Sequence, residues 1–167
     1  FSGCNLHFGF KLRRENGGEM NKEKHVFYTH KVNYYETDKM GITHHSNYIR
    51  FMEEARLEFL KEIGYPMQRI EAERITSPVT AVSCEYKRST TYDDLIEIDV
   101  SLKSYNGVVL TLSYVMRDKN NGDLIAKAES SHCFIRENGL PIAVKKHFPG
   151  MDEVLRSLVS DEKSDRK

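Results

Sequence analysis

The feature that most constrains this fold is one long amphipathic segment followed by runs that alternate with period two. Between residues 46 and 63, apolar side chains recur at helical steps of three and four: Tyr48, Met52, Ala55, Phe59 and Ile63. The later runs have the period of half-buried strands and cover 80–86, 96–102, 108–116 and 124–134. A single helix must therefore cover the apolar face of a sheet.

A further alternating run precedes the helix, and short connections set the strand directions. The apolar residues from Val26 to Tyr34 alternate with polar ones. Asn121-Gly122 favours a hairpin between the last two runs, and the other short connections favour antiparallel neighbours. We therefore expect an α+β fold with the order strand, long helix, then four antiparallel strands.

The helix ends carry their own signals. Ser46 or Asn47 is expected to cap the long helix by accepting a backbone N–H, and Gly64 is expected to end it. Apolar residues after Pro149 predict a second helix over about 151–159.

The chain is expected to form one domain with a tail at each end. Residues 1–20 are rich in glycine and charge and show neither period, so we expect a tail there. The domain is expected over 21–160, because no repeat or linker divides it. Residues 161–167 are expected to form a polar C-terminal tail.

Met20 is expected to be the natural start of the protein. The preceding Gly17-Gly18-Glu19 is what a translated bacterial ribosome-binding sequence would encode. The alternative is an arm whose apolar residues alternate and pack on a neighbouring subunit, namely Leu6, Phe8 and Phe10.

Composition argues against several classes of partner. Lys plus Arg and Asp plus Glu number 25 each, so no net field favours nucleic acid or an anionic membrane. No run approaches the roughly 18 apolar residues of a membrane span, and the three cysteines lack a metal or redox spacing. We expect a cytoplasmic protein with reduced thiols, no metal and no cofactor. The scattered histidines are interpreted as structural or surface residues: His25, His30, His132 and His147.

The residues that carry chemistry gather between Tyr34 and Tyr48, where a strand ends and the helix begins. This segment holds a carboxylate at Asp38, a glycine at Gly41 and histidines at positions 44 and 45. The Thr-Asp pair, the glycine three residues later and the helix-opening His/Asn/Tyr cluster resemble the signature of the 4-hydroxybenzoyl-CoA thioesterase and YbgC-like branch of the hot-dog superfamily.

The resemblance covers about residues 25–136, including 85–88 and the 92–95 segment that follows. It implies a hot-dog fold, in which an antiparallel five-stranded sheet wraps around one long central helix. It also implies an acyl-CoA thioesterase that releases a free acid and CoA. The partners implied are an acyl-CoA substrate and further copies of the chain, as a homodimer or homotetramer joined through strand edges.

The same resemblance assigns roles within the site. It makes Asp38 the catalytic carboxylate, either as nucleophile or as general base for water, and makes Glu36 a neighbour. It places His45 where the helix N-terminus meets the thioester carbonyl, with a backbone N–H nearby as oxyanion donor. Further substrate contacts are expected from Gly41, His44, Asn47, Tyr48, Lys87 and Arg88, the last two toward the CoA phosphates.

Two other functions remain as hypotheses. A non-catalytic hot-dog module would bind acyl-CoA without a usable carboxylate, which Asp38 disfavours. A hot-dog hydratase or dehydratase acting on acyl-ACP is suggested by His147-Phe148-Pro149-Gly150, the start of that family's active-site segment. That segment should precede the central helix, whereas only seventeen residues follow Gly150 here. Release of thiol from acyl-CoAs would separate an enzyme from a binding module.

Overall fold

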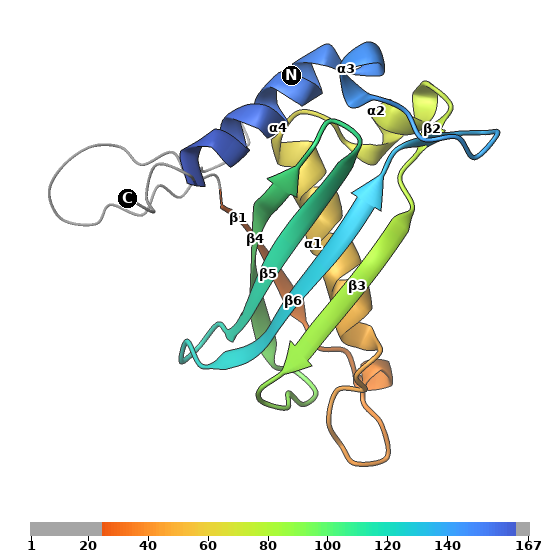
Figure 1. Cartoon of the computed structure of the whole chain (residues 1–167). Coiled ribbons are helices and arrows are strands. Elements are labelled where there is room, and N and C mark those ends of the chain that lie inside the picture. The colour runs from red at the N-terminus through yellow and green to blue at the C-terminus, as the bar shows by residue number, and fades with distance from the viewer. Residues whose placement is uncertain (1–24, 163–167) are drawn as a thin grey trace, which may run out of the picture.

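A five-stranded antiparallel sheet lies along one side of a long helix in the computed structural model, which describes residues 25–162 (Figure 1). The strand order is β1-β4-β5-β6-β3. The strands are β1 (Val26–Lys31), β3 (Val79–Tyr86), β4 (Leu95–Tyr105), β5 (Val109–Asp118) and β6 (Leu124–Cys133). The expected α+β architecture, with one strand before the helix and four after it, is confirmed.

The long helix α1 (Asn47–Glu62) supplies one half of the core. Its apolar residues Phe51, Ala55 and Phe59 are fully buried. They face the sheet, whose central strands bury every second residue, including Ile96, Ile98, Val100, Leu112 and Met116. Each large apolar side chain buried in this way stabilises the fold by roughly 1.5–3 kcal/mol, so the alternation dictates which sheet face meets α1.

The strand before the helix ends earlier than the sequence pattern indicated. Strand β1 stops at Lys31, and Tyr34–Glu36 form a short 3-10 helix, η1. The side chain of Glu36 accepts the backbone N–H of Asn33, which closes a capping box and turns the chain. Tyr34 is therefore 77% exposed and not part of the strand, contrary to the prediction.

The predicted end of α1 at Gly64 is confirmed, since this glycine follows the helix with φ +87°. The predicted N-terminal cap is wrong. Ser46 has helical backbone angles, and its hydroxyl lies 2.8 Å from Nδ1 of His44. The amide of Asn47 points the other way, with Nδ2 donating to the carbonyl of Glu36 at 2.8 Å. Both side chains are thus used to hold the preceding loop, and neither caps the helix.

The second predicted helix exists and is longer than expected. Helix α4 (Pro149–Glu162) starts two residues before the predicted boundary, because proline fits the first helical position, where its missing N–H is not needed. It is the last described element, so the segment His147 to Gly150 leads into a helix and not into a sheet. The elements that the sequence did not predict are α2 (Met67–Ala72), α3 (Val144–His147) and the small sheet of β2 (Ile75–Thr76) with β7 (Ile135–Arg136).

Strand β3 is an open edge of the sheet. It pairs with β6 on one side and with no strand of residues 25–162 on the other. Its apolar residues Val79, Val82 and Tyr86 are 51%, 47% and 46% exposed, respectively. This long, uncovered edge contrasts with the buried alternation of the central strands.

A group of buried polar side chains lies between α1 and β6. The hydroxyl of Ser130 is 2.7 Å from both Nε2 of His132 and the hydroxyl of Tyr114. Arg56, which is 3% exposed, binds the carboxylate of Glu53 through Nε and Nη2. Within the described residues, Nδ1 of His132 is the one buried side-chain polar atom without a hydrogen-bond partner.

The predicted start at Met20 and the possible N-terminal arm lie outside the described residues, as does most of the predicted C-terminal tail. Between residues 25 and 162, no helix is both long and apolar enough to cross a membrane.

Candidate functional site

The segment around Asp38 forms a small closed loop between η1 and α1. Thr37 and Thr43 are paired across its base by an isolated β-bridge. Inside it, the N–H of Asp38 donates to the carbonyl of Ile42, and the N–H of Gly41 donates to the carbonyl of Asp38, both at 2.9 Å. Gly41 adopts φ +76°, a left-handed conformation that glycine reaches without strain. The loop therefore presents Asp38 in a defined backbone geometry.

The carboxylate of Asp38 is oriented by the same loop. Its Oδ1 accepts the backbone N–H of Met40 at 2.7 Å, which is the turn chemistry expected for aspartate. Its Oδ2 has no hydrogen-bond partner among the residues that the structure describes, and the side chain is half-buried. One oxygen is thus held by the turn, and the other is not engaged by the described residues.

The backbone N–H groups at the start of α1 are partly used and partly open. The N–H of His44 donates to the carbonyl of Glu36 at 2.8 Å, and those of Asn47 and Tyr48 donate to the carbonyls of His44 and His45. For the N–H of His45, no partner exists within residues 25–162. Because the helix dipole is positive here, this N–H is a suitable donor to a developing negative charge.

The two histidines at the helix start lie against each other. Their ring centroids are 4.2 Å apart, and the ring of His45 is exposed while that of His44 is partly covered. The carbonyl of His45 accepts the hydroxyl of Tyr86, the last residue of β3, at 3.1 Å. The open edge strand therefore ends beside the helix start.

The loop that follows β3 forms a second wall of the site. Thr90 is 3% exposed; its carbonyl accepts the N–H of Thr43 at 2.8 Å, and its hydroxyl lies 2.7 Å from that of Thr43. The hydroxyl of Tyr48 is 3.0 Å from the same Thr90 oxygen, and burial raises the pKa of Tyr48. Sequence analysis missed Thr90, because nothing in the polar run Ser89-Thr90-Thr91 distinguishes the buried residue.

Lys87 and Arg88 lie at the exposed end of the same loop. Their backbone N–H groups donate to the carbonyl of Ile125, at 2.8 Å and 3.1 Å. Each side chain is exposed and forms an ion pair with a carboxylate, Lys87 with Glu85 and Arg88 with Asp123. All eight residues predicted from the sequence thus gather around the start of α1 and the end of β3, at the lower end of Figure 1.

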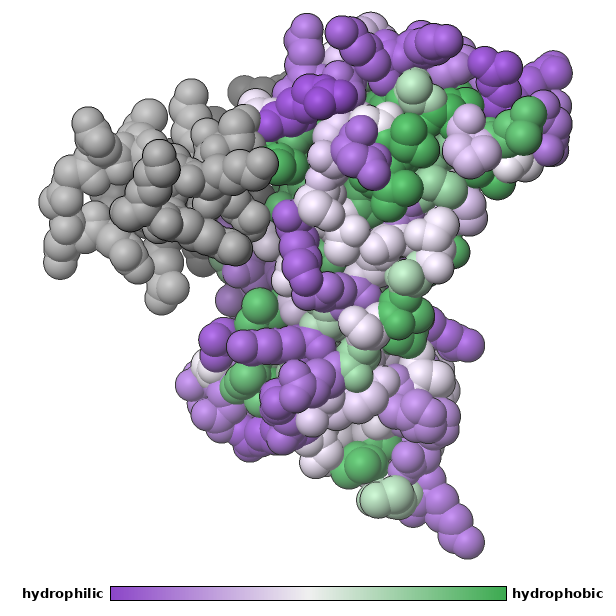
Figure 2. All heavy atoms as spheres, in the orientation of Figure 1, coloured by the Kyte–Doolittle hydropathy of each residue, from purple (hydrophilic) through white to green (hydrophobic). Residues whose placement is uncertain are grey.

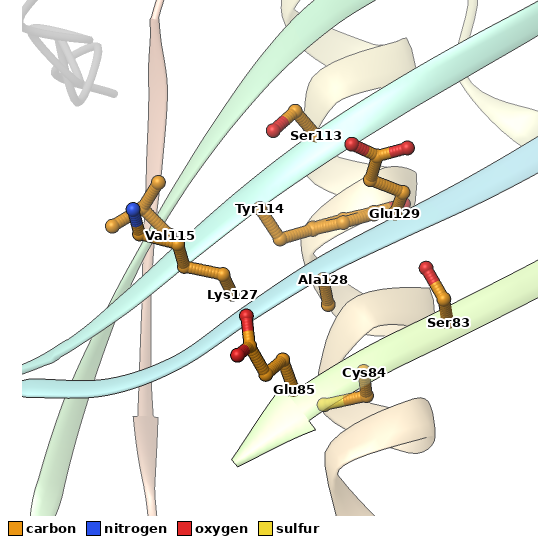
Figure 3. A pocket seen from close by; sticks show the side chains of 9 residues that line it. All are labelled: Ser83, Cys84, Glu85, Ser113, Tyr114, Val115, Lys127, Ala128 and Glu129. Carbon is orange, nitrogen blue, oxygen red and sulfur yellow. The ribbon is translucent and has the colours of Figure 1, made fainter. Parts of the chain in front are cut away.

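A separate hollow lies on the opposite face of the sheet. It has a volume of about 440 Å³, and in Figure 3 side chains such as Glu129 and Glu85 line it on the side of the sheet away from α1. The residues that line it from the outer face include Ser83, Glu85, Ser113, Lys127 and Glu129. Figure 2 shows that this face is mostly polar. None of the eight predicted site residues lines the hollow.

The described part of the chain shows no metal centre, and the thiol of Cys84 is not activated. Residues 25–162 contain no cluster of three or more His, Cys, Asp or Glu side chains placed to hold a metal ion. Burial raises the pKa of the thiol of Cys84, a half-buried residue of β3, so thiolate formation there is disfavoured. Neither feature replaces the carboxylate of Asp38 as the predicted reactive group.

Comparison with known proteins identifies relatives by sequence. The sequence profile of the thioesterase-like superfamily matches residues 32–157. The acyl-CoA thioester hydrolase YbgC of Escherichia coli is 31% identical over 99 residues, which is 59% of this chain and 73% of YbgC.

Solved structures share the fold. The DHNA-CoA thioesterase of Staphylococcus aureus aligns with a TM-score of 0.79 at 26% identity, over 86% of this chain and 95% of its own. A hypothetical protein of Aquifex aeolicus aligns with a TM-score of 0.70 at 34% identity, over 75% of this chain and 98% of its own. These similarities confirm the hot-dog fold expected from the sequence.

Proposed function

Because this chain belongs to the thioesterase-like superfamily and is therefore a thioester hydrolase, we propose that it hydrolyses an acyl-CoA thioester to a free acid and CoA, with Asp38 as the catalytic carboxylate. The observation that carries this proposal is the state of the Asp38 side chain. Its Oδ1 is fixed by the N–H of Met40 while Oδ2 has no partner within residues 25–162. A carboxylate held in this way can attack a carbonyl carbon or take a proton from an attacking water.

The start of α1 supports an oxyanion site. As the thioester carbonyl becomes tetrahedral, its oxygen gains negative charge, which a backbone N–H near a helix N-terminus stabilises. In our proposal this donor is the N–H of His45, which makes no hydrogen bond to the described residues. The exposed imidazole of His45 then orients the substrate or the water.

The loop after β3 supports a site for the CoA phosphates. Lys87 and Arg88 are exposed cations whose present partners are exposed carboxylates, and such surface pairs are weak. A multiply charged phosphate would compete for both. The substrate contacts predicted for Gly41, His44, Asn47 and Tyr48 stay predictions. Asn47 and Tyr48 are buried and hydrogen-bonded within the protein, so their geometry supports a role in shaping the site.

The edge strand supports a homodimer. Val79–Tyr86 contains neither proline nor lysine, the residues that commonly protect a sheet edge from pairing with another chain. Two copies joined through β3 in antiparallel fashion would form a closed two-fold interface. The junction would lie next to the site, because Tyr86 contacts His45. Assembly into tetramers and the cytoplasmic location stay predictions.

The proposed reaction is tested by measuring thiol release from a panel of acyl-CoAs for the unmodified protein and for Asp38→Asn. Asparagine keeps the acceptor oxygen for the N–H of Met40 but cannot act as nucleophile or base, so we expect turnover to fall by at least about a hundredfold. The control is Asp118→Asn, because Asp118 makes the same kind of turn by accepting the N–H of Asn120 at 2.8 Å. Its turnover should equal that of the unmodified protein.

Two outcomes would count against the proposal. Near-normal turnover by a folded Asp38→Asn protein would remove the catalytic assignment. Tight binding of acyl-CoA by the unmodified protein, with no thiol release from any member of the panel, would instead support the non-catalytic binding module.

A further inference from the structure

A buried histidine lies beneath the loop that carries Asp38. His30 is on β1 and is 6% exposed. Its Nε2 is 2.9 Å from Oε2 of Glu36, and its Nδ1 is 3.0 Å from Oε2 of Glu54. Both ring nitrogens therefore meet carboxylate oxygens, an arrangement that an imidazole with two N–H donors satisfies. Sequence analysis interpreted His30 only as a structural or surface residue.

Glu36 connects this histidine to both sides of the loop. Its buried carboxylate accepts the backbone N–H of Asn33 at 2.7 Å in addition to facing His30. Its backbone carbonyl accepts the N–H of His44 and the Nδ2 of Asn47, both at 2.8 Å. The position of Glu36 thus sets the chain before Asp38 and the chain after it.

Glu54 anchors the other side of His30 to α1. The same Oε2 that faces His30 accepts the hydroxyl of Tyr28 at 2.9 Å, and burial together with this bond raises the pKa of Tyr28 to about 12. The His30 ring also stacks on Phe51, with centroids 3.9 Å apart. The His30 side chain, which projects from β1, is thereby held by contacts with the Glu36 segment and with α1.

We propose that His30 is a positioning residue for the reaction, which sets the geometry of the Asp38 loop and of the His45 N–H through Glu36. The predicted effect on catalysis rests on the proposed function, whereas the predicted effect on the loop does not. Without His30, the buried carboxylate of Glu36 loses its hydrogen-bonding partner, and the carbonyl that holds the helix start moves with it. Displacements of about 1 Å at reacting groups lower rates by as much as about a hundredfold.

The test compares His30→Gln with His25→Gln. Glutamine at position 30 carries both of its N–H donors on one nitrogen, so it cannot reach Glu36 and Glu54 from two separate ring positions as Nε2 and Nδ1 of histidine do. His25 is the matched control, because its Nδ1 lies 2.7 Å from a carboxylate oxygen of Asp99 just before the same strand, at an exposed position away from the loop. Glu54→Gln provides a milder variant that folds readily, since the Glu54 side chain is 44% exposed.

Two quantities are measured for each variant: hydrogen exchange of the backbone amides of residues 36–48, and kcat and KM for a hydrolysed acyl-CoA. For His30→Gln we expect exchange in this segment to quicken about tenfold, with smaller changes in β5 and β6. We expect kcat to fall by about tenfold or more while KM stays within about twofold. Glu54→Gln should shift both quantities in the same direction by less, and His25→Gln should leave both unchanged.

The exchange and kinetic measurements fail separately. Unchanged exchange over 36–48 in both His30→Gln and Glu54→Gln would overturn the positioning role, whatever the activity. Quickened exchange with unchanged kcat would overturn its link to catalysis. If the unmodified protein hydrolyses no acyl-CoA, the proposed function fails, while the exchange comparison still decides whether His30 holds the loop.

Discussion

The buried His132 should make this protein lose stability in mild acid through one identifiable group. His132 is 1% exposed, and Nδ1 has no partner within residues 25–162. Burial, reinforced by the positive charge of Arg56, lowers the pKa of His132 from 6.5 to about 4. The perturbation is His132→Gln, which can keep a hydrogen bond to Ser130 but cannot titrate.

The direction in which pH changes the free energy of unfolding follows from which state, folded or unfolded, takes up the proton. Between pH 6.5 and about 4 the histidine of the unfolded chain is protonated while that of the folded chain is not. The contribution of neutral His132 to the free energy of unfolding is therefore complete above pH 6.5 and is lost as the pH falls toward 4. Proton linkage gives a slope of roughly 1.2 kcal/mol per pH unit and a total of about 3 kcal/mol. For a domain of this size that corresponds to a fall in Tm of about 6–12 °C.

The assay is urea unfolding at about pH 7 and about pH 5, where linkage predicts that the unmodified protein loses about 2 kcal/mol more than His132→Gln. Subtracting the loss measured for His132→Gln from that of the unmodified protein removes the acid sensitivity that both share. This shared part comes from carboxylates such as Glu53 and Asp152, whose pKa values are lowered by arginine partners. Ser130→Ala is the control, because it removes the hydrogen bond but keeps the imidazole. It should be less stable at every pH with the slope retained. Equal pH slopes for the unmodified protein and His132→Gln would refute the reasoning.

Two further outcomes are expected. Val82→Lys places a charge in the middle of the open edge strand, where Val82 is 47% exposed, and should shift a dimer toward monomer in light scattering; a monomeric unmodified protein would contradict the proposed assembly. A variant that begins at Met20 should match the full chain in Tm, oligomer size and thioesterase rate, because the glycines among residues 1–19 interrupt any sustained apolar period. A large loss in any of these would instead support the packed N-terminal arm.

The parts of the fold that the sequence predicted are those governed by local periodicity. Alternation in β4 and β5 and helical spacing in α1 each reflect burial of one face, so they could be read residue by residue. The end of β1 could not, because the same alternation continues through Tyr34 while the capping interaction of Glu36 turns the chain. Propensity also failed for the N-terminal cap of α1, since Ser46 and Asn47 bond to the preceding loop.

The site was predictable where one short segment carries it, and less so where distant segments meet. Asp38, Gly41, His44 and His45 lie within eight residues, and their resemblance to a known signature identified them together. Thr90 and the contact of Tyr86 with His45 depend on which strand lies at the edge and where its loop returns. The periodicity of one sequence shows which residues of a strand are buried but not which strands are neighbours. Contacts that depend on strand order therefore could not be predicted from it.

The contact between the end of β3 and the start of α1 gives the proposed dimer a kinetic consequence. Tyr86 is both the last residue of the exposed edge and the donor to the carbonyl of His45. If dimerisation through β3 fixes the position of Tyr86, the fraction of catalytically active sites depends on the protein concentration, because mass action sets the fraction of chains in the dimer. The rate per chain would then rise with enzyme concentration before reaching a plateau, and the concentration at half-plateau would report the dissociation constant of the assembly.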